Sequence, residues 1–332
     1  MAAPPEIDHA SALQFVINAA SGSSDAQAKG GVIEAALHNS GRRADLLFCK
    51  PAELSDTAHR AAAQAIATRA AVVAVGGDGT LNTVAQAAHA AGCAMGVVPQ
   101  GTFNYFARTH GIPADPADAV RQLLRSVPTP VQVAGINERV FLVNASLGLY
   151  PDLLEDREAF KARFGRSRWV AFVAACATLL RAQRRLRLHI EMGGQERDLQ
   201  ALTLFVGNNR LQLQQFGAEP DDTLAGAPGD GTIAALVLRP VGTMSMLNLM
   251  LHGAMGRLGE AAGVERFEFE HLVVRPRLLP GRRGIKVAFD GEVTMMRTPL
   301  DFRVHARPLY LLKPPRALTL SNTGAHGEGA TA

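Results

Sequence analysis

Apolar runs of four or five residues alternate with stretches of helical periodicity through the first 130 residues. Each run is short enough for a buried strand, and each periodic stretch places apolar residues three or four positions apart. Such alternation predicts a parallel, doubly wound sheet in an α/β domain. The expected strands cover residues 14–18, 45–49, 72–75 and 95–98, and the expected helices lie near 28–39, 57–70 and 81–88.

The last helix of this domain is marked at its start by Asp115 and Pro116, residue types favoured at the N-cap and the first helical position. Pro128 and Pro130 are expected to end it, because a proline cannot continue a helix. The first domain should therefore cover residues 12–130.

The second half of the chain carries short strand patterns separated by turn residues. Residues 135–137 and the pair Gly193-Gly194 each lie between two such patterns and predict hairpins. This spacing indicates an antiparallel β-sandwich domain over residues 131–302. The expected strands are 131–133, 140–144, 187–191, 199–206, 232–238, 266–275, 284–289 and 300–304, with helices at about 152–184 and 244–258 and a disordered polar tail at 316–332.

The most informative stretch is Gly76-Gly-Asp-Gly-Thr-Leu-Asn82, between the third strand and its helix. Glycines let a ligand approach the backbone, and the loop amides with the helix N-terminus attract an anion such as phosphate. Asp78 would repel a phosphate unless it holds a cation or moves a proton, which suggests Mg²⁺ or general-base chemistry. The alternative is an ordinary glycine turn with Asp78 as the N-cap. The stretch is neither a P-loop nor the dinucleotide-binding fingerprint.

A second glycine loop, Pro99-Gln-Gly-Thr-Phe-Asn104, follows the next strand along the chain. In open α/β sheets ligands lie beyond the carboxyl ends of the strands. Pro-Gln-Gly-Thr alone would be an ordinary turn, but two glycine loops from successive strands predict two walls of one nucleotide site.

Composition narrows the class of protein. The chain has 332 residues, 47% of them hydrophobic, and a net charge of +4, which fits two globular domains. Base-stacking and zinc motifs are absent from the sequence, so we expect no nucleic acid partner. Cys49, Cys93 and Cys176 lack metal-site spacing and fit a reducing compartment such as the cytoplasm. The N-terminus is too polar for a signal peptide, and the apolar run at 169–180 is too short to span a bilayer.

Together these motifs resemble the diacylglycerol kinase catalytic-domain family, especially its bacterial lipid kinases, which are related to sphingosine kinases and NAD kinases. The resemblance runs through residues 14–315 and implies an ATP- and Mg²⁺-dependent kinase. The substrate implied is the hydroxyl of a diacylglycerol-like lipid at a membrane surface. A returning segment at about 303–315 would rejoin the first domain. The downstream motifs are Asn144-Ala-Ser-Leu-Gly148, Gly207-Asn-Asn209, Gly229-Asp-Gly231 and Asp290-Gly-Glu292.

The resemblance also implies roles for individual residues. Glu292 would accept the proton of the lipid hydroxyl, and Asp78 would act with it in catalysis. A structural Mg²⁺ would use Asp230, with backbone oxygens from Ala227 and Thr232. Nucleotide contacts would come from the two glycine loops and the ends of the first two strands, namely from Asn18, Cys49, Gly76, Gly77, Asp78, Gly79, Thr80, Leu81, Asn82, Thr83, Gly101, Thr102 and Asn104.

Two positions depart from the family pattern. Tyr105 stands where relatives often carry an aspartate, which removes a carboxylate from the expected active site, and Ala19 stands where they usually carry proline. Two alternative functions stay open. One is a nucleotide-binding regulatory module that has lost activity, and the other is an NAD kinase-like enzyme, against which Leu81-Asn82 and Asp290-Gly-Glu292 argue.

Basic residues gather between positions 157 and 187, where nine lysines and arginines face a single acid, Glu158. Trp169, the one tryptophan, lies beside Arg166 and Arg168. Basic residues next to an aromatic favour an anionic interface, and a solvated helix face is the equally weighted alternative. We therefore expect peripheral contact with the inner face of a membrane. The oligomeric state stays open, with a homodimer as one option.

Overall fold

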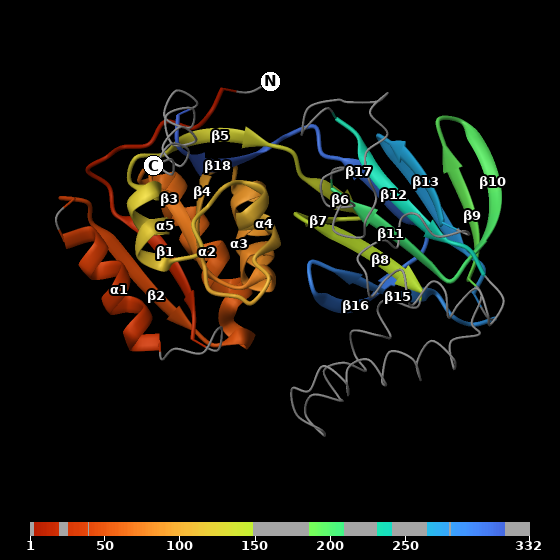
Figure 1. Cartoon of the computed structure of the whole chain (residues 1–332), viewed down its shortest axis with the longest axis horizontal. Coiled ribbons are helices and arrows are strands. Elements are labelled where there is room, and N and C mark those ends of the chain that lie inside the picture. The colour runs from red at the N-terminus through yellow and green to blue at the C-terminus, as the bar shows by residue number, and fades with distance from the viewer. Residues whose placement is uncertain are drawn as a thin grey trace, which may run out of the picture. The chain divides into compact units, whose positions relative to one another are not determined.

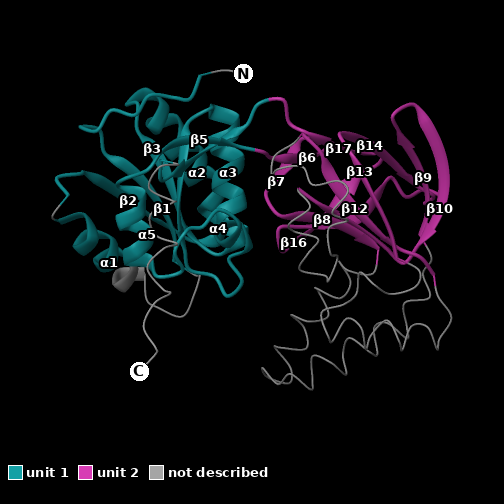
Figure 2. Cartoon of the chain, turned by 45° about the horizontal axis from the view of Figure 1, so that its top comes forward, with its two compact units in different colours: residues 1–131, 307–332 teal, residues 132–306 magenta. Residues whose placement is uncertain are grey.

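The computed structural model describes residues 3–19, 26–38, 40–148, 186–208, 231–240, 264–278 and 280–315. The chain divides into two compact units: unit 1 joins residues 1–131 with 307–332, and unit 2 covers residues 132–306 (Figure 2). From sequence, the divisions were expected after residues 130 and 302. The expected helices at 152–184 and 244–258, the basic segment as far as residue 185 and the polar tail lie outside the described residues. Of the helices within the described ranges, none combines the length and apolar character needed to cross a membrane.

Unit 1 is built on a six-stranded sheet. The pairs from the first of its strands to the fifth are parallel, and the last pair is antiparallel. The two strands before the glycine loops are buried along their whole length, as expected for strands covered on both faces. In spatial order the strands are β2 (Ala44–Cys49), β1 (Leu13–Asn18), β3 (Ala71–Gly76), β4 (Ala94–Pro99), β18 (Leu309–Lys313) and β5 (Val127–Val131) (Figure 1).

Helices cover this sheet in two groups. The helices α2 (Leu54–Ala67) and α3 (Asp78–Ala91) pack against each other and on the central strands, while α1 (Ala26–His38) packs with α5 (Pro116–Leu123). The α/β prediction is confirmed. The N-cap prediction for α5 is confirmed too, because the Asp115 carboxylate accepts a 2.9 Å hydrogen bond from the backbone amide of Asp118. A short turn η1 (Pro51–Glu53) and a short helix α4 (Tyr105–Thr109) complete unit 1 among the described residues.

The strand β5 corrects the sequence prediction. Pro128 and Pro130 were expected only to end a helix, yet they lie inside β5, opposite Leu312 and Tyr310 of β18. A proline has no amide hydrogen for a second neighbour, so it is tolerated on an edge strand. The position of β5 at the edge of the sheet therefore explains why two prolines do not break it.

The returning segment is tied to unit 1 at two places. β18 lies between β4 and β5, where Leu309, Leu311 and Leu312 are buried. Arg307, just before it, donates from its guanidinium to the backbone oxygens of His89 and Ala90 at the end of α3. A cation at the C-terminus of a helix is also favoured by the helix dipole.

Unit 2 is a sandwich of two antiparallel sheets, as predicted. One sheet has the order β10 (Gln195–Ala201), β9 (Leu186–Met192), β14 (His271–Pro276), β17 (Leu300–Val304), β6 (Ala134–Ile136) and β7 (Arg139–Phe141). The other has the order β13 (Val264–Phe269), β12 (Ile233–Leu238), β11 (Thr203–Gly207), β8 (Asn144–Gly148), β15 (Gly284–Phe289) and β16 (Glu292–Arg297).

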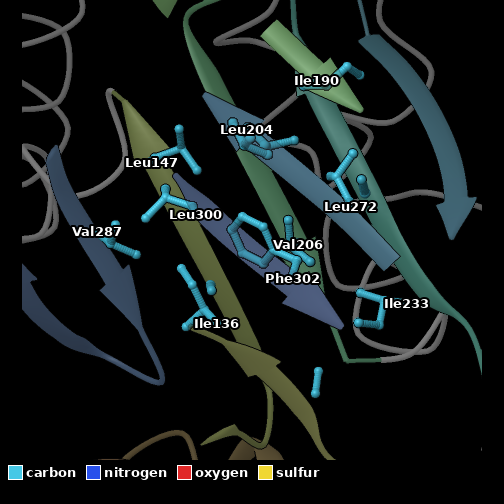
Figure 3. Close-up of a cluster of buried hydrophobic side chains, with 14 of the residues drawn as sticks. Ile136, Leu147, Ile190, Leu204, Val206, Ile233, Leu272, Val287, Leu300 and Phe302 are labelled. Carbon is cyan, nitrogen blue, oxygen red and sulfur yellow. The ribbon is translucent and has the colours of Figure 1, made fainter. Parts of the chain in front are cut away.

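The core of unit 2 lies between these sheets. Figure 3 shows Ile136 and Phe302 from the first sheet with Leu147, Val206 and Val287 from the second, all nearly or fully inaccessible to solvent. Burying a large aliphatic or aromatic side chain stabilises the fold by about 1.5–3 kcal/mol. This shared core holds the turns at the sandwich edges in fixed positions.

Several details of unit 2 differ from the sequence prediction. The expected strand 199–206 is divided at Leu202 between β10 and β11, and the expected strand 140–144 is divided between β7 and β8; in both cases the two strands belong to different sheets. The first hairpin turns at Asn137 and Glu138 rather than at 135–137, since Asn137 adopts a positive φ of 53° and Ile136 pairs with Arg139. The expected strand 266–275 is broken at Glu270 into β13 and β14, which belong to different sheets. The strand β16 was not predicted. The hairpin at Gly193-Gly194 is confirmed, with positive φ at both glycines.

Candidate functional site

The carboxyl ends of four parallel strands form one edge of the unit 1 sheet. Asn18 at the end of β1 pairs with Cys49 at the end of β2, and Gly76 at the end of β3 pairs with Pro99 at the end of β4. Both glycine loops therefore leave from this edge, as does the turn after Asn18. In sheets of this class, ligands bind at such an edge.

The first loop turns directly into α3. Gly77 is the N-cap in extended conformation, and Asp78 is the first helical residue. Glycine is required at position 76, because a Cβ there would lie 2.6 Å from the Thr80 side chain. The Thr80 hydroxyl in turn accepts a 3.0 Å hydrogen bond from the side-chain nitrogen of Asn18, which joins β1 to the loop. The alternative of Asp78 as N-cap of α3 is wrong, because Gly77 occupies that position.

The two glycine loops lie against each other. A Cβ on Gly101 would come within 2.8 Å of the Gly77 Cα, and a Cβ on Gly77 would come within 3.3 Å of the Gly101 Cα. The backbone amide of Gln100 also donates a 2.8 Å hydrogen bond to the Gly76 oxygen. The structure thus brings together the two loops that the sequence expected to form one site, at a separation that only glycine permits.

Asn104 closes the second loop. Its side-chain oxygen accepts from the Gly101 amide, and its side-chain nitrogen donates to the Gly101 oxygen, both at 2.9 Å. The residue is buried in the left-handed region, with φ 49°, which asparagine tolerates better than most residues. Thr102 and Phe103 are consequently exposed at the tip of the loop.

The Asp78 carboxyl lies at the N-terminus of α4. Burial raises its pKa, and the backbone amides of Phe106, Tyr105 and Asn104 oppose that shift. One carboxylate oxygen, Oδ1, is buried and accepts no hydrogen bond from the described part of the chain. A buried acceptor without a donor is costly, and a cation or a ligand proton at this position would satisfy it.

These features fit a phosphate group with Mg²⁺. Mg²⁺ in nucleotide sites is usually held by one or two carboxylates together with the phosphates themselves. The orphan oxygen of Asp78 supplies such a carboxylate. Among the described residues no group of three or more histidine, cysteine or acidic side chains is arranged to hold a metal without a ligand.

Gln100 is a site residue that sequence reasoning missed. Its side-chain oxygen is buried and, within the described ranges, has no hydrogen-bond partner, like the Asp78 oxygen one loop away. The signal available was its place between Pro99 and Gly101, at the carboxyl end of β4. A polar side chain directly before a loop glycine could have been counted with the loop.

The other residues predicted to contact the nucleotide lie near the same edge of the sheet, but their side chains are buried or hydrogen-bonded within the protein. Leu81 and Asn82 are buried in the first turns of α3, and the Thr83 hydroxyl donates to the Gly79 oxygen inside the helix. The Cys49 thiol is buried and donates to the Ile17 oxygen at 3.6 Å, and burial raises its pKa. Direct contact of these four residues, Leu81, Asn82, Thr83 and Cys49, with a nucleotide stays a prediction.

In unit 2 the Asp290-Gly291 turn is a hydrogen-bonding centre. Asp290 is 4% exposed, and its carboxylate accepts from the backbone amides of Leu142, Val143 and Asn144 at 2.7, 2.8 and 3.0 Å. Its own amide donates to the Asn144 oxygen. Both turn residues have positive φ, 46° and 88°, so the two-residue turn joins β15 to β16 tightly.

Glu292 follows this turn as the first residue of β16. Its side chain is exposed, unlike that of Asp290, and pairs across the hairpin with Phe289. Partial desolvation nonetheless raises the pKa of Glu292, and the charge of Arg139 opposes the rise. A carboxyl with a raised pKa at an accessible position is suited to accept a proton.

The predicted structural metal site is described only in part. Ala227 and Asp230 lie outside the described residues. The backbone oxygen of Thr232 accepts a 2.9 Å hydrogen bond from the side-chain nitrogen of Gln132, which also donates to the backbone oxygen of Asn208 at 2.6 Å. Binding of a metal by Thr232 stays a prediction.

Comparison with known proteins assigns the glycine loops to a family. Residues 12–136 match the family model described as the diacylglycerol kinase catalytic domain. The matched segment contains all of the paired strand ends and both loops. Over residues 12–136 the chain is therefore similar to the diacylglycerol kinase catalytic domain.

Relatives extend the match beyond that segment. A protein of Pseudomonas putida KT2440 named "Probable lipid kinase YegS-like" is 27% identical over 278 residues, 80% of this chain and 85% of its own length. An uncharacterized protein of Synechocystis sp. PCC 6803 is 30% identical over 247 residues, and a Klebsiella pneumoniae 342 protein of the YegS-like name is 37% identical over 98 residues. Those two alignments cover 73% and 28% of this chain, but only 54% and 33% of the relatives.

Solved structures share the fold of the two units. A diacylglycerol kinase structure from Bacillus anthracis str. Sterne superposes with a TM-score of 0.63 at 16% identity, covering 92% of this chain and 97% of that one. Another structure from the same strain gives a TM-score of 0.68 at 19% identity, with the same coverage. At these identities the likeness establishes the α/β and β-sandwich architecture.

Tyr105 directly follows the second glycine loop. Tyr105 begins α4, and its ring stacks on Phe103 with centroids 5.4 Å apart and planes within 3°. An aromatic surface therefore stands beside the glycine loops, where the family resemblance implied a carboxylate. Any cation at this edge would depend more heavily on Asp78.

Proposed function

We propose that the protein is an ATP-dependent lipid kinase that transfers the γ-phosphate of ATP to the hydroxyl of a diacylglycerol-like lipid. The match of residues 12–136 to a kinase catalytic domain supports phosphotransfer, and the YegS-like relatives are named as probable lipid kinases. The identity of the nucleotide and of the acceptor is our inference.

One observation carries the proposal. Two glycine loops from adjoining parallel strands touch at Gly77 and Gly101, next to a buried carboxylate oxygen of Asp78 that lacks a hydrogen bond from the described residues. Loop amides with the N-terminus of α3 suit phosphate oxygens, and the carboxylate suits the accompanying cation. In a turn with only a structural role, a buried carboxylate oxygen without a hydrogen bond would destabilise the fold and serve no function.

The two carboxylates divide the chemistry. ATP with Mg²⁺ supplies the phosphoryl group, and the first loop has no lysine to neutralise it. Asp78 would hold the cation, and a carboxylate on Mg²⁺ is a poor proton acceptor. Glu292 would instead take the proton of the lipid hydroxyl as the hydroxyl oxygen bonds to phosphorus and the bond to the departing ADP oxygen breaks. The raised pKa of Glu292 suits that task.

A second Mg²⁺, held by Asp230 with backbone oxygens of Ala227 and Thr232, is part of the proposal. It would be structural rather than catalytic. Thr232 directly precedes β12, whose residues are all buried, so a cation there would fix the entry of the chain into the sandwich.

The test is transfer of labelled γ-phosphate from ATP into a total lipid extract, with the product identified by mass spectrometry. A labelled phospholipid that forms with the wild type and not with Asp78→Asn supports the proposal. Phosphorylation of NAD in the absence of lipid or detergent would instead favour an NAD kinase-like enzyme.

The competing function is a nucleotide-binding module without activity, which Tyr105 favours because it replaces an acid expected near the active site. ATP binding measured by calorimetry, with no labelled product across the lipid extract, would establish that function. Restoring the acid with Tyr105→Asp should then increase transfer.

A further inference from the structure

The β6–β7 hairpin is fixed to the strand that carries Glu292. At its tip, the Asn137 side chain donates to the Arg297 oxygen at 3.1 Å and accepts from the Asp301 amide at 2.8 Å. Arg297 is the last residue of β16, and Glu292 is the first. The hairpin and β16 therefore hold one another although they belong to different sheets.

This anchoring places Arg139 over the core. Arg139 pairs with Ile136 next to the hairpin turn, and its guanidinium lies 5.8 Å from the centre of the Phe289 ring. Phe289 is 2% exposed and belongs to the core between the sheets, so its ring is a fixed surface. An arginine over an aromatic face is held there by the ring quadrupole even when its charge faces solvent.

Glu292 lies opposite the residue that carries this ring. Phe289 and Glu292 are opposite one another across the Asp290-Gly291 turn, and opposite residues in a hairpin point to the same face. Arg139 and Glu292 thus share the Phe289 ring as a neighbour. Asp290, which lies between Phe289 and Glu292 in the sequence, is turned away, and its carboxylate accepts hydrogen bonds from three backbone amides.

Two other charged residues of the β15–β16 hairpin occupy register positions away from Glu292. Lys286 of β15 pairs with Met295, and Arg297 pairs with Gly284 at the opposite end of β16. Among the described residues, Arg139 is the one charged group with a resolved influence on the Glu292 pKa, which it lowers against the effect of desolvation.

We propose that Arg139 is a positioning residue for Glu292: from its seat on the Phe289 ring it keeps the Glu292 carboxylate ionised and in place as a proton acceptor. The catalytic meaning of this role rests on the proposed function, since Glu292 is a base only if the protein is a kinase. The electrostatic part does not, because it concerns two side chains of unit 2 alone.

The experiment follows the Glu292 carboxyl directly. Protein labelled with ¹³C at glutamate side chains is titrated by NMR, and the Glu292 signal is assigned by its absence in Glu292→Gln. Arg139→Gln should shift the titration midpoint to higher pH. Arg139→Lys, which keeps the charge but not the planar stacking, should fall between the wild type and Arg139→Gln.

Arg297→Gln is the matched control, because it removes an exposed arginine from the other end of the same strand. It should leave the midpoint unchanged. An unchanged midpoint in Arg139→Gln, or an equal shift in the control, overturns the proposal. Backbone amide spectra establish that each variant is folded before its titration is interpreted.

Kinetics then separate this inference from the proposed function. If lipid phosphorylation is observed, Arg139→Gln should lower kcat about two- to fivefold near pH 6 and approach the wild type near pH 8.5. A pH-independent rise in the KM for lipid would show that Arg139 binds the acceptor instead, and would overturn the positioning role. If no lipid is phosphorylated, the NMR midpoints still decide whether Arg139 controls Glu292.

Discussion

Asp78 in unit 1 and Asp290 in unit 2 both stand next to glycine, and the structure treats them in opposite ways. Asp290 is buried, with its carboxylate satisfied by three backbone amides. Asp78 is only partly buried, yet it keeps one inaccessible oxygen without a hydrogen bond from the described residues. A satisfied buried carboxylate contributes to folding, whereas an unsatisfied one costs folding free energy and is typical of a functional site.

The contrast separates stability from function within one residue type. Asp290 should be essential for the sandwich whether or not the protein is active, and Asp78 should be dispensable for folding. The four predictions below run from the largest expected effect to the smallest, and the first two test this difference directly.

Asp290→Ala should lower the free energy of unfolding by about 4 kcal/mol, because three buried amides lose a charged acceptor. Chemical denaturation followed by circular dichroism measures the loss. Asp301→Ala is the control in the same unit. Its carboxylate makes partly exposed ion pairs with His271 and Arg303, worth about 1 kcal/mol or less. Equal losses for the two variants would contradict the role given to Asp290.

Asp78→Asn should reduce turnover about 100-fold or more while leaving the free energy of unfolding unchanged or slightly higher. The reason is that a neutral amide keeps the shape but removes a charge that burial destabilises. Mg·ATP affinity, measured by calorimetry, should fall as well. Should the variant unfold more readily than the wild type, Asp78 would belong with Asp290 as a structural residue.

Gly101→Ala should cost about 1–3 kcal/mol and weaken nucleotide binding, because its Cβ would push against the Gly77 backbone and force the loops apart. Gly31→Ala in α1 is the matched control. A Cβ at Gly31 meets nothing within 4 Å, so that variant should gain up to about 1 kcal/mol from helix propensity. Thermal unfolding with and without ATP compares them; a neutral Gly101→Ala would mean that the loops are not in contact.

The smallest effect expected is a pH dependence from His110 in unit 1. Burial, aided by the charge of Lys313, lowers the pKa of His110 to about 3, below its unfolded value of about 6.5. The unfolded chain therefore binds a proton that the folded chain does not, and stability falls as pH drops from 6.5, by at most about 1.4 kcal/mol per unit.

His110→Phe should remove that part of the acid sensitivity while keeping an aromatic contact with Phe106. Urea midpoints at pH 7.5 and pH 5.5 give the comparison. The drop between the two pH values should be smaller in the variant by about 1 kcal/mol. Equal drops would show that His110 is protonated in the folded protein.

Local patterns predicted the part of the fold that is local. The run of valines in β3, the glycine loop and the start of α3 follow one another within a dozen residues, and each agrees with the others. The hairpin at Gly193-Gly194 could be predicted for the same reason, since two adjacent glycines can both take positive φ.

Features that depend on residues far away in the sequence could not be predicted from local patterns. β5 is a strand because of β18, about 180 residues later, and its two prolines indicated the opposite. The partners of Asp290 lie 146–148 residues earlier in the chain, so nothing beside it in sequence indicates three hydrogen bonds. From the sequence, a catalytic role was expected for Glu292, two residues later, and no role of its own was expected for Asp290. Gln100 was passed over because an unsatisfied side-chain oxygen appears only in three dimensions.

The returning strand β18 has a consequence for the order in which the protein is made. During synthesis, β1 to β4 leave the ribosome long before the residues that complete their sheet, and all of unit 2 is translated in between. Until β18 arrives, the edge of β4 is open, and β5 lacks its neighbour in the sheet. An unpaired edge strand whose residues are buried in the folded protein is prone to aggregation. A nascent chain stopped before Arg307 would thus carry both glycine loops on an unfinished sheet, and a strand translated after all of unit 2 completes the sheet of unit 1.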